Sequence, residues 1–180
     1  MPCCRGCCDC VRFAPRRCRL SDGASRSRLQ DYMRSPSEES LNRVKDCLPD
    51  VIYHPGFMWE YCRHLYLNRR YCDCLGVFPV YHAHVRKTSE TLCDLGNAYL
   101  NVYGFREAEA CFAQARQMIP TRIYPRYCLF RLYRSQGDTL RARQTAEALV
   151  VFPVRIMNST SIRIKAEARN YLKHLRRNDW

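Results

Sequence analysis

Six of the 13 cysteines in this sequence crowd its N-terminal end: Cys3, Cys4, Cys7, Cys8, Cys10 and Cys18. Two overlapping C-x-x-C spacings occur among them, from Cys4 to Cys7 and from Cys7 to Cys10. Four thiolates at such spacings suit a zinc ion, although a structural zinc site usually has a second ligand pair a dozen or more residues further on. Only Cys18 follows nearby, so we favour an oxidation-prone tail; a metal site, a redox dithiol and reversible acylation are the alternatives.

A C-x-C pair, Cys72 and Cys74, precedes an H-x-H pair, His82 and His84. Thiolate and imidazole are ligands that zinc and copper accept. Residues two apart on a helix point about 200° from each other, so such a pair on a helix does not readily chelate one ion. We therefore expect neither a metal ion nor a cofactor at these positions.

Sequence signatures of the common enzyme classes are missing. The seven glycines are scattered, so they form neither a phosphate-binding loop nor a dinucleotide fingerprint, and neither H-E-x-x-H nor G-x-S-x-G occurs. The carboxylates of Glu107 and Glu109 are more typical of a solvated helix face than of an acid–base couple. We expect a protein that is not an enzyme and has no catalytic residue.

The composition supports a packed core within a chain of 180 residues, 47% of them apolar. Unbroken apolar runs reach about seven residues, against the roughly 20 that a membrane-spanning helix needs. The N-terminal segment is basic but lacks the apolar stretch of a secretory signal. The default expectation is a cytoplasmic location, with membrane association through a partner as the alternative.

A change of pattern near residue 36 separates a tail from a helical domain. Residues 1–36 are rich in Cys and Arg and then polar, with few apolar anchors, so we expect a disordered leader there. From Ser37 the apolar residues Leu41, Val44 and Leu48 follow at spacings of three and four, which is typical of a helix. The helical domain is predicted over residues 37–178.

The middle of the chain contains a repeat pattern. In one 34-residue window, seven positions match the consensus of the tetratricopeptide (TPR) repeat: Leu95, Gly96, Tyr99, Ala108, Phe112, Ala115 and Pro120. A step of 34 forward reaches Leu129, Tyr133 and Ala142, and a step of 34 back reaches Tyr61, Leu65 and Cys74. This resemblance implies an all-α, TPR-like α-solenoid with helical hairpins at about 55–88, 89–122 and 123–155, and a capping helix near 160–177.

The repeat positions predict how the helices of the middle hairpin pack. Two antiparallel helices approach closely only where small side chains meet. We therefore expect Gly96 to face Ala108, while Tyr99 and Phe112 fill the wedge to the next hairpin.

The first hairpin departs from this pattern in two ways. Its small positions hold Cys62 and Cys74, which we interpret as small buried apolar residues. Its second helix contains Gly76 and Pro79, which are poor helix formers. We expect that helix to end early.

A narrower resemblance covers roughly residues 50–175. The segment from Met118 to Tyr133, with its Pro-x-Arg-x-Tyr-Pro-x-Tyr joint, and the segment from Phe152 to Ser159 look like the C-terminal TPR extension of bacterial O-antigen ligase or polymerase family proteins. Members of that family are membrane proteins that join or transfer lipid-linked glycans, and their chemistry resides in a transmembrane part. The resemblance therefore implies a detached TPR portion with no catalytic residue of its own.

TPR arrays usually bind partners on a concave surface formed by their first helices. Aromatic and Arg side chains are enriched at interface hot spots, and several fall on this surface. In the predicted register it presents Trp59, Arg63, Tyr66, Asn97, Asn101, Tyr127, Arg131 and Arg134. The alternative is that some of these aromatic side chains only pack between hairpins. We expect a protein or peptide as the partner, and an association with a membrane protein as a further possibility.

Positive charge is concentrated toward the C-terminus. The net charge is +13, and residues 121–180 alone carry 13 Lys or Arg against 4 Asp or Glu, a net of +9. The predicted capping helix has an apolar stripe that includes Ala168, Tyr171 and Leu172, and a basic outer face. We interpret that face as solvated and do not expect nucleic acid as the partner; anionic lipid or nucleic acid remains the alternative for this segment.

Overall fold

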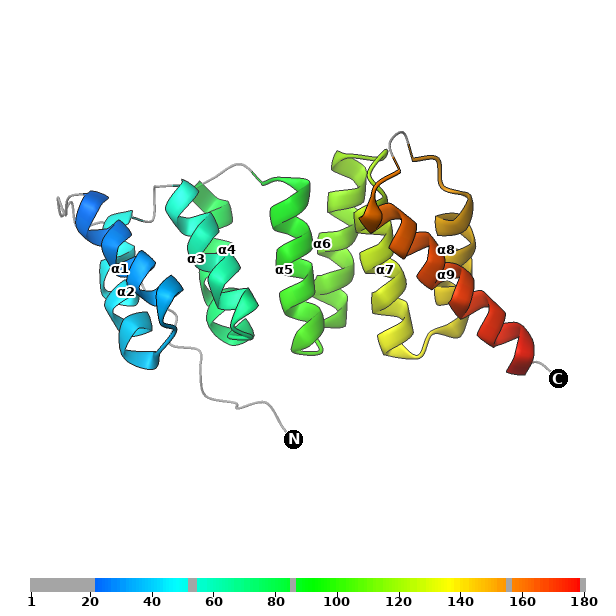
Figure 1. Cartoon of the computed structure of the whole chain (residues 1–180), viewed down its shortest axis with the longest axis horizontal. Coiled ribbons are helices and arrows are strands. Elements are labelled where there is room, and N and C mark those ends of the chain that lie inside the picture. The colour runs from blue at the N-terminus through cyan, green and yellow to red at the C-terminus, as the bar shows by residue number, and fades with distance from the viewer. Residues whose placement is uncertain (1–21, 52–54, 85–86, 155–156, 179–180) are drawn as a thin grey trace. The chain divides into compact units, whose positions relative to one another are not determined.

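The computed structural model describes residues 22–51, 55–84, 87–154 and 157–178, and every regular element in these ranges is an α-helix. Figure 1 shows the helices as pairs that run back along one another. Their bounds are α1 Asp22–Arg34, α2 Glu38–Val51, α3 Pro55–Leu67, α4 Tyr71–His84, α5 Ser89–Asn101, α6 Phe105–Met118, α7 Ile123–Gln136, α8 Thr139–Val151 and α9 Ser159–Asn178. The all-α prediction is confirmed for the described part of the chain.

The chain divides between Lys87 and Thr88 into two compact units. In the first unit, α1 packs against α2, α3 packs against α4, and α1 also contacts α3. In the second unit, each helix from α5 to α9 packs against the next one. Helices two apart along the chain touch as well, α5 with α7 and α7 with α9. This division falls inside the single repeat domain predicted over residues 37–178.

The predicted leader over residues 1–36 extends too far and is wrong for Asp22–Arg34, which form α1. Ser25, Leu29 and Tyr32, spaced four and three apart, are buried at 1 to 2% exposure. The burial of the apolar Leu29 side chain and the Tyr32 ring offsets the entropy of ordering a segment that is otherwise polar. Residues 1–21, which hold the cysteine cluster, lie outside the described residues.

Helix α4 runs from Tyr71 to His84 and therefore continues through Gly76 and Pro79, where an early end is predicted. Proline lacks an N–H, so the helix forgoes one backbone hydrogen bond there. Cys74 and Phe78, one turn apart, are buried at 0% and 2% exposure. Packing along that face supports the helix against its poor local propensity.

The turn inside each of the last three hairpins has the same geometry. Arg69, Tyr103 and Gly137 have φ angles of 59°, 62° and 74°, and each is separated from the next by one full repeat period. The residue after each of them donates its N–H back to the preceding helix, to the carbonyls of Leu65, Tyr99 and Tyr133 at 2.9, 2.9 and 3.0 Å. A left-handed residue with such a hydrogen bond is the Schellman ending of a helix. The chain therefore reverses in the same way once in every repeat.

A small buried residue follows each of these turns. Cys74, Ala108 and Ala142 are 0% exposed and hold the same position in successive repeats. Their N–H groups donate to the carbonyls four positions earlier, those of Arg70, Gly104 and Asp138. Cys62 is buried at 1% exposure, and its carbonyl accepts a hydrogen bond from the Cys74 thiol at 3.5 Å. The two cysteines thus occupy the core of the first unit, where small side chains are predicted.

The neighbour of Gly96 across the α5–α6 contact is Phe112, whereas Ala108 is predicted there. A Cβ placed on Gly96 would lie 2.5 Å from the Cε1 atom of the Phe112 ring, so the ring itself covers the glycine. Phe112 is 0% exposed and belongs to a core that includes Leu92 and Leu129. The glycine is needed because the ring occupies the space that any larger side chain would take.

Helix α9 covers the last hairpin. Ile164 and Ala168 are buried against a core of α7 and α8 that includes Phe130 and Leu149. The rings of Phe130 and Tyr171 meet edge to face at 5.2 Å. Figure 1 shows α9 crossing this hairpin obliquely. Its apolar residues therefore cover the core of the second unit, as a capping helix does.

Helix α9 begins with a reciprocal cap. The Asn158 side chain accepts from the Ser161 N–H at 2.8 Å, and the Ser161 hydroxyl accepts from the Asn158 N–H at 3.0 Å. This arrangement satisfies donors that the first turn would leave unpaired.

The repeated turn predicts opposite effects of substitution at two equivalent positions. Tyr103→Gly should raise the free energy of unfolding by about 1 kcal/mol, because glycine removes the backbone strain of the left-handed conformation. The side chain that is lost is largely exposed. Gly137→Ala should lower it by about 1 kcal/mol, since nothing lies within 4 Å of the added Cβ and the cost is confined to the backbone. Denaturant unfolding followed by circular dichroism measures both. Equal signs for the two variants would contradict the prediction.

The contact between Gly96 and Phe112 predicts a coupled pair. Gly96→Ala should lower the free energy of unfolding by about 1–2 kcal/mol, because overpacking outweighs the better helix propensity of alanine. In a Phe112→Leu background, which removes the obstructing ring, the same change should be neutral or stabilising. Gly76→Ala on α4, with open space around the added Cβ, is the matched control and should not destabilise the protein. Chemical denaturation measures each variant, and additive effects at residues 96 and 112 would show that the ring is not the cause.

Candidate functional site

The predicted partner-binding residues of α3 form one row in the first unit. The Arg63 guanidinium lies over the Trp59 ring, 5.1 Å from its centroid. The Tyr66 ring lies 5.6 Å from that of Tyr71. Arg63 is exposed, whereas Trp59 and Tyr66 are half-buried, so both aromatic rings are partly accessible. A cation stacked on a ring presents a flat surface with donors at its edge.

Asn97 and Asn101 of α5 differ in their surroundings. Asn97 is buried at 2% exposure and donates from Nδ2 to the Tyr124 hydroxyl of α7 at 3.4 Å. Its Oδ1 atom is buried without a hydrogen-bond partner among the described residues. Asn101 is exposed and donates from Nδ2 to the Asn97 carbonyl at 2.7 Å. One buried amide oxygen on the face shared by α5 and α7 is therefore left without the partner that such an atom normally has.

The predicted residues of α7 are largely occupied by α9. The Tyr127 hydroxyl donates to Glu167 at 2.7 Å, and Arg134 forms an ion pair with Glu167 at 2.8 Å. Burial raises the pKa of Tyr127, and the hydrogen bond to Glu167 adds to this effect. Arg131 instead lies over the Tyr127 ring, 5.9 Å from its centroid, and does not share the bond to Glu167. Of the three predicted residues, Arg131 is thus the one best placed to meet a partner.

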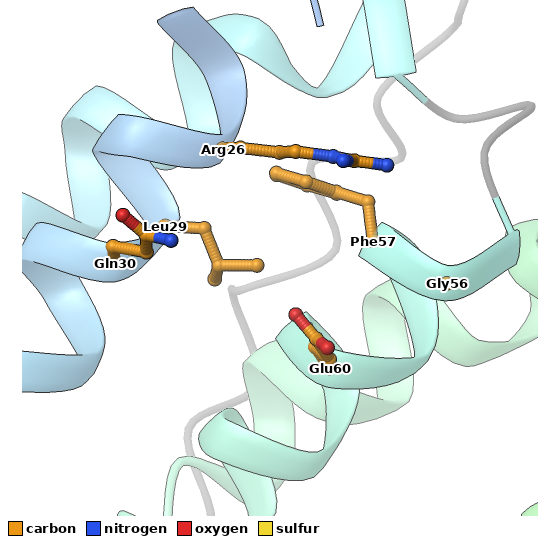
Figure 2. A pocket seen from close by; sticks show the side chains of 6 residues that line it. All are labelled: Arg26, Leu29, Gln30, Gly56, Phe57 and Glu60. Atoms are coloured by element: carbon orange, nitrogen blue, oxygen red, sulfur yellow. The ribbon is translucent and has the colours of Figure 1, made fainter. Parts of the chain in front are cut away.

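A pocket of about 320 Å³ lies between α1 and α3 in the first unit. Figure 2 shows the side chains of Arg26 and Phe57 extending over it, with Glu60 below. The lining residues are Arg26, Leu29, Gln30, Gly56, Phe57 and Glu60. The lining combines two apolar side chains, Leu29 and Phe57, with the charged side chains of Arg26 and Glu60.

This pocket extends the predicted surface into a hairpin that the repeat register does not reach. Arg26 and Gln30 lie one hairpin earlier than Trp59 and Arg63, so they hold the corresponding positions on α1. The offset between α1 and α3 is one position shorter than the repeat period. The spacing of the buried residues of α1, which begins at Ser25, is the signal that reveals this extra first helix.

The sequence predicts a solvated carboxylate at Glu109, whereas in the structure this carboxylate accepts hydrogen bonds from two other helices. It accepts from the Tyr133 hydroxyl at 2.8 Å and from Arg141 at 3.2 Å, and so joins α6 to α7 and α8. Burial raises the pKa of Tyr133, and the hydrogen bond to Glu109 contributes in the same direction. Glu107 is exposed on the same helix. The two carboxylates therefore differ in their surroundings, and Glu109 contributes to the packing of the second unit.

The cysteines of the described residues lie mainly in the cores. Within residues 22–51, 55–84, 87–154 and 157–178, no three side chains of His, Cys, Asp or Glu are grouped to hold a metal ion. Cys72 is exposed while Cys74 is buried, and the side chains of His82 and His84 lie outside the description.

Two further thiols meet inside the second unit. Cys93 of α5 and Cys128 of α7 are buried in one core. A hydrogen bond with Cys128, together with burial, raises the pKa of the Cys93 thiol. A thiol held in its protonated form is a poor nucleophile, so this contact is one of packing.

Neither the scan against protein-family models nor the search of curated proteins finds a match. Among the described residues, no helix has the length and apolar character required to cross a membrane.

The hydrogen bond from Tyr127 to Glu167 predicts a measurable contribution of the contact between α7 and α9 to the free energy of unfolding. Tyr127→Phe should lower the free energy of unfolding by about 1 kcal/mol, because it removes one hydrogen bond and retains the ring. Tyr133→Phe should act similarly through its bond to Glu109, while Tyr103→Phe, at an exposed ring, should have no effect. Chemical denaturation measures all three. A stability of Tyr127→Phe equal to that of Tyr103→Phe would show that the hydroxyl does not anchor α9.

Proposed function

We propose that this protein is a noncatalytic TPR-type repeat module that binds a protein or peptide through its first helices, α1 and α3 in the first unit and α5 and α7 in the second. The observation that carries the proposal is the turn that recurs at Arg69, Tyr103 and Gly137. Because the chain reverses identically at 34-residue intervals, equivalent faces of the first helices repeat. Within the second unit, α5 and α7 contact each other, so their equivalent faces lie side by side for a partner.

The side chains on this face support a peptide as the partner. Arg63 on Trp59 and Arg131 on Tyr127 are planar cation–ring pairs of the kind found at interface hot spots. Asn101 of α5 is exposed, so its side-chain amide is accessible to the backbone of a peptide. The pocket beside the Phe57 ring has room for one side chain in the first unit.

A random-peptide display selection against the full chain tests the proposal. Peptides enriched by the wild type should lose about tenfold in affinity when an accessible side chain of a first helix is removed, as in Arg63→Ala, Asn101→Ala or Arg131→Ala. Arg106→Ala and Arg116→Ala on α6 are matched controls, because they remove exposed cations from a second helix. Fluorescence anisotropy gives the affinities.

Two results would contradict the proposal. One is a selection that enriches no peptide over a displayed control. The other is a set of peptides whose affinity depends on Arg106 or Arg116 and not on the first helices. Circular dichroism of each variant checks that the helices remain intact.

The O-antigen ligase-like resemblance favours a second candidate function, an accessory role in assembling cell-surface glycans as a detached TPR portion. The resembling segment includes the joint between α6 and α7, where Ile123 and Pro125 are buried. These residues support the scaffold and supply no glycan chemistry. A neighbouring reading frame that encodes a multispan membrane protein of that family would support this role, and a gene distant from any glycan gene would oppose it.

A further inference from the structure

Helix α9 is strongly basic, with six Lys or Arg side chains, one histidine and a single acidic side chain. The Lys and Arg residues are Arg163, Lys165, Arg169, Lys173, Arg176 and Arg177. The acidic residue, Glu167, is bound by Arg134 and Tyr127 of α7. Within the described residues, none of the six basic side chains forms an ion pair with a carboxylate. Among the described residues, their charge is therefore left without an acidic partner.

The rest of the second unit is different, because much of its charge is paired. Most of its carboxylates hold an arginine, in the pairs Glu90–Arg122, Glu109–Arg141, Asp138–Arg141, Glu147–Arg143 and Glu167–Arg134. These contacts occupy acidic side chains on α5, α6, α8 and α9 and in the turn before α8. The unpaired positive charge of the second unit is thus densest on α9.

Three of the basic residues of α9 form a row. Lys165, Arg169 and Lys173 are four positions apart, so they follow one side of the helix with a rise of about 6 Å between neighbours. Arg169 and Lys173 are exposed and Lys165 is half-buried. The side that meets the core is different, since Ile164 and Ala168 are buried there. We use the name basic face for this row together with Ile162.

The basic face also contains an exposed apolar side chain. Ile162 lies three positions before Lys165 and seven before Arg169, hence on the same side of α9, and it is 53% exposed. Met157, just before the helix, is 55% exposed. A nucleic-acid backbone would engage the cations but not these apolar groups. An anionic lipid surface engages both, because cations meet the headgroups while apolar side chains enter the acyl boundary.

We propose that the basic face of α9 binds anionic lipid membranes, with the helix lying in the plane of the surface. Lys165, Arg169 and Lys173 contact the lipid phosphates, and Ile162 and Met157 enter the interface. The helix does not cross the bilayer. This binding uses a different helix from the first-helix surface, so it does not depend on the peptide-binding proposal.

Vesicle sedimentation with the full chain tests the proposal. The protein should bind vesicles of equal parts phosphatidylcholine and phosphatidylglycerol, should not bind pure phosphatidylcholine, and should be released by added salt. The variant K165Q/R169Q/K173Q should bind about 100-fold more weakly, since each surface charge contributes about fivefold. The control K87Q/R106Q/R116Q removes the same charge from exposed positions outside α9 and should bind as the wild type does.

Ile162→Gln separates a membrane from a polyanion. It should weaken vesicle binding several-fold and leave binding to a double-stranded RNA probe unchanged. The proposal is overturned if anionic vesicles are not bound at low salt, or if the α9 variant and the control lose binding equally. RNA binding in the absence of vesicle binding overturns it in favour of nucleic acid. If the triple variant loses its helical circular dichroism spectrum, K173Q alone replaces it, because Lys173 is exposed. This single variant should bind anionic vesicles about fivefold more weakly than the wild type.

Discussion

Most of the structure depends on one backbone constraint, the left-handed residue that ends the first helix of a hairpin. Once this residue turns the chain, the next N–H bonds back to the helix, and the second helix starts at a fixed angle. Soon afterwards a small side chain must lie at the helix contact, as at Cys74 and Ala108. Arg69 and Tyr103 accept an unfavourable conformation to maintain this geometry, and Gly137 does so without strain.

The same constraint explains how much of the fold the sequence predicts. The small and aromatic residues recur at 34-residue intervals, and this spacing places the hairpins of α3 to α8, although not the end of α4. Helix α1 does not follow the pattern. The described turn after it contains Pro36 and no residue of positive φ, and the spacing from α1 to α3 is one position shorter than the repeat period. Its core positions also include Ser25, a polar residue that gives little hydrophobic signal.

The candidate surface is less predictable than the fold. The register identifies which residues share the first-helix face, but it does not show which of them another helix covers. Tyr127 and Arg134 are engaged by Glu167 from 40 and 33 positions further along the chain, a pairing without local signature. Asn97 is likewise a polar residue whose burial depends on α7. The contrast between the ion-paired arginines around α8 and the unpaired cations of α9 also becomes visible only when the ion pairs are known.

The native cysteines can report local opening of each unit, because buried thiols lie in both cores. Cys47, Cys62 and Cys74 lie in the core of the first unit, and Cys93 and Cys128 lie in that of the second. A buried thiol reacts with an alkylating reagent only when its surroundings open, so its labelling rate reports the free energy of that opening. Mass spectrometry of peptides after timed alkylation can therefore compare local opening in the two units of the native chain, without an introduced cysteine.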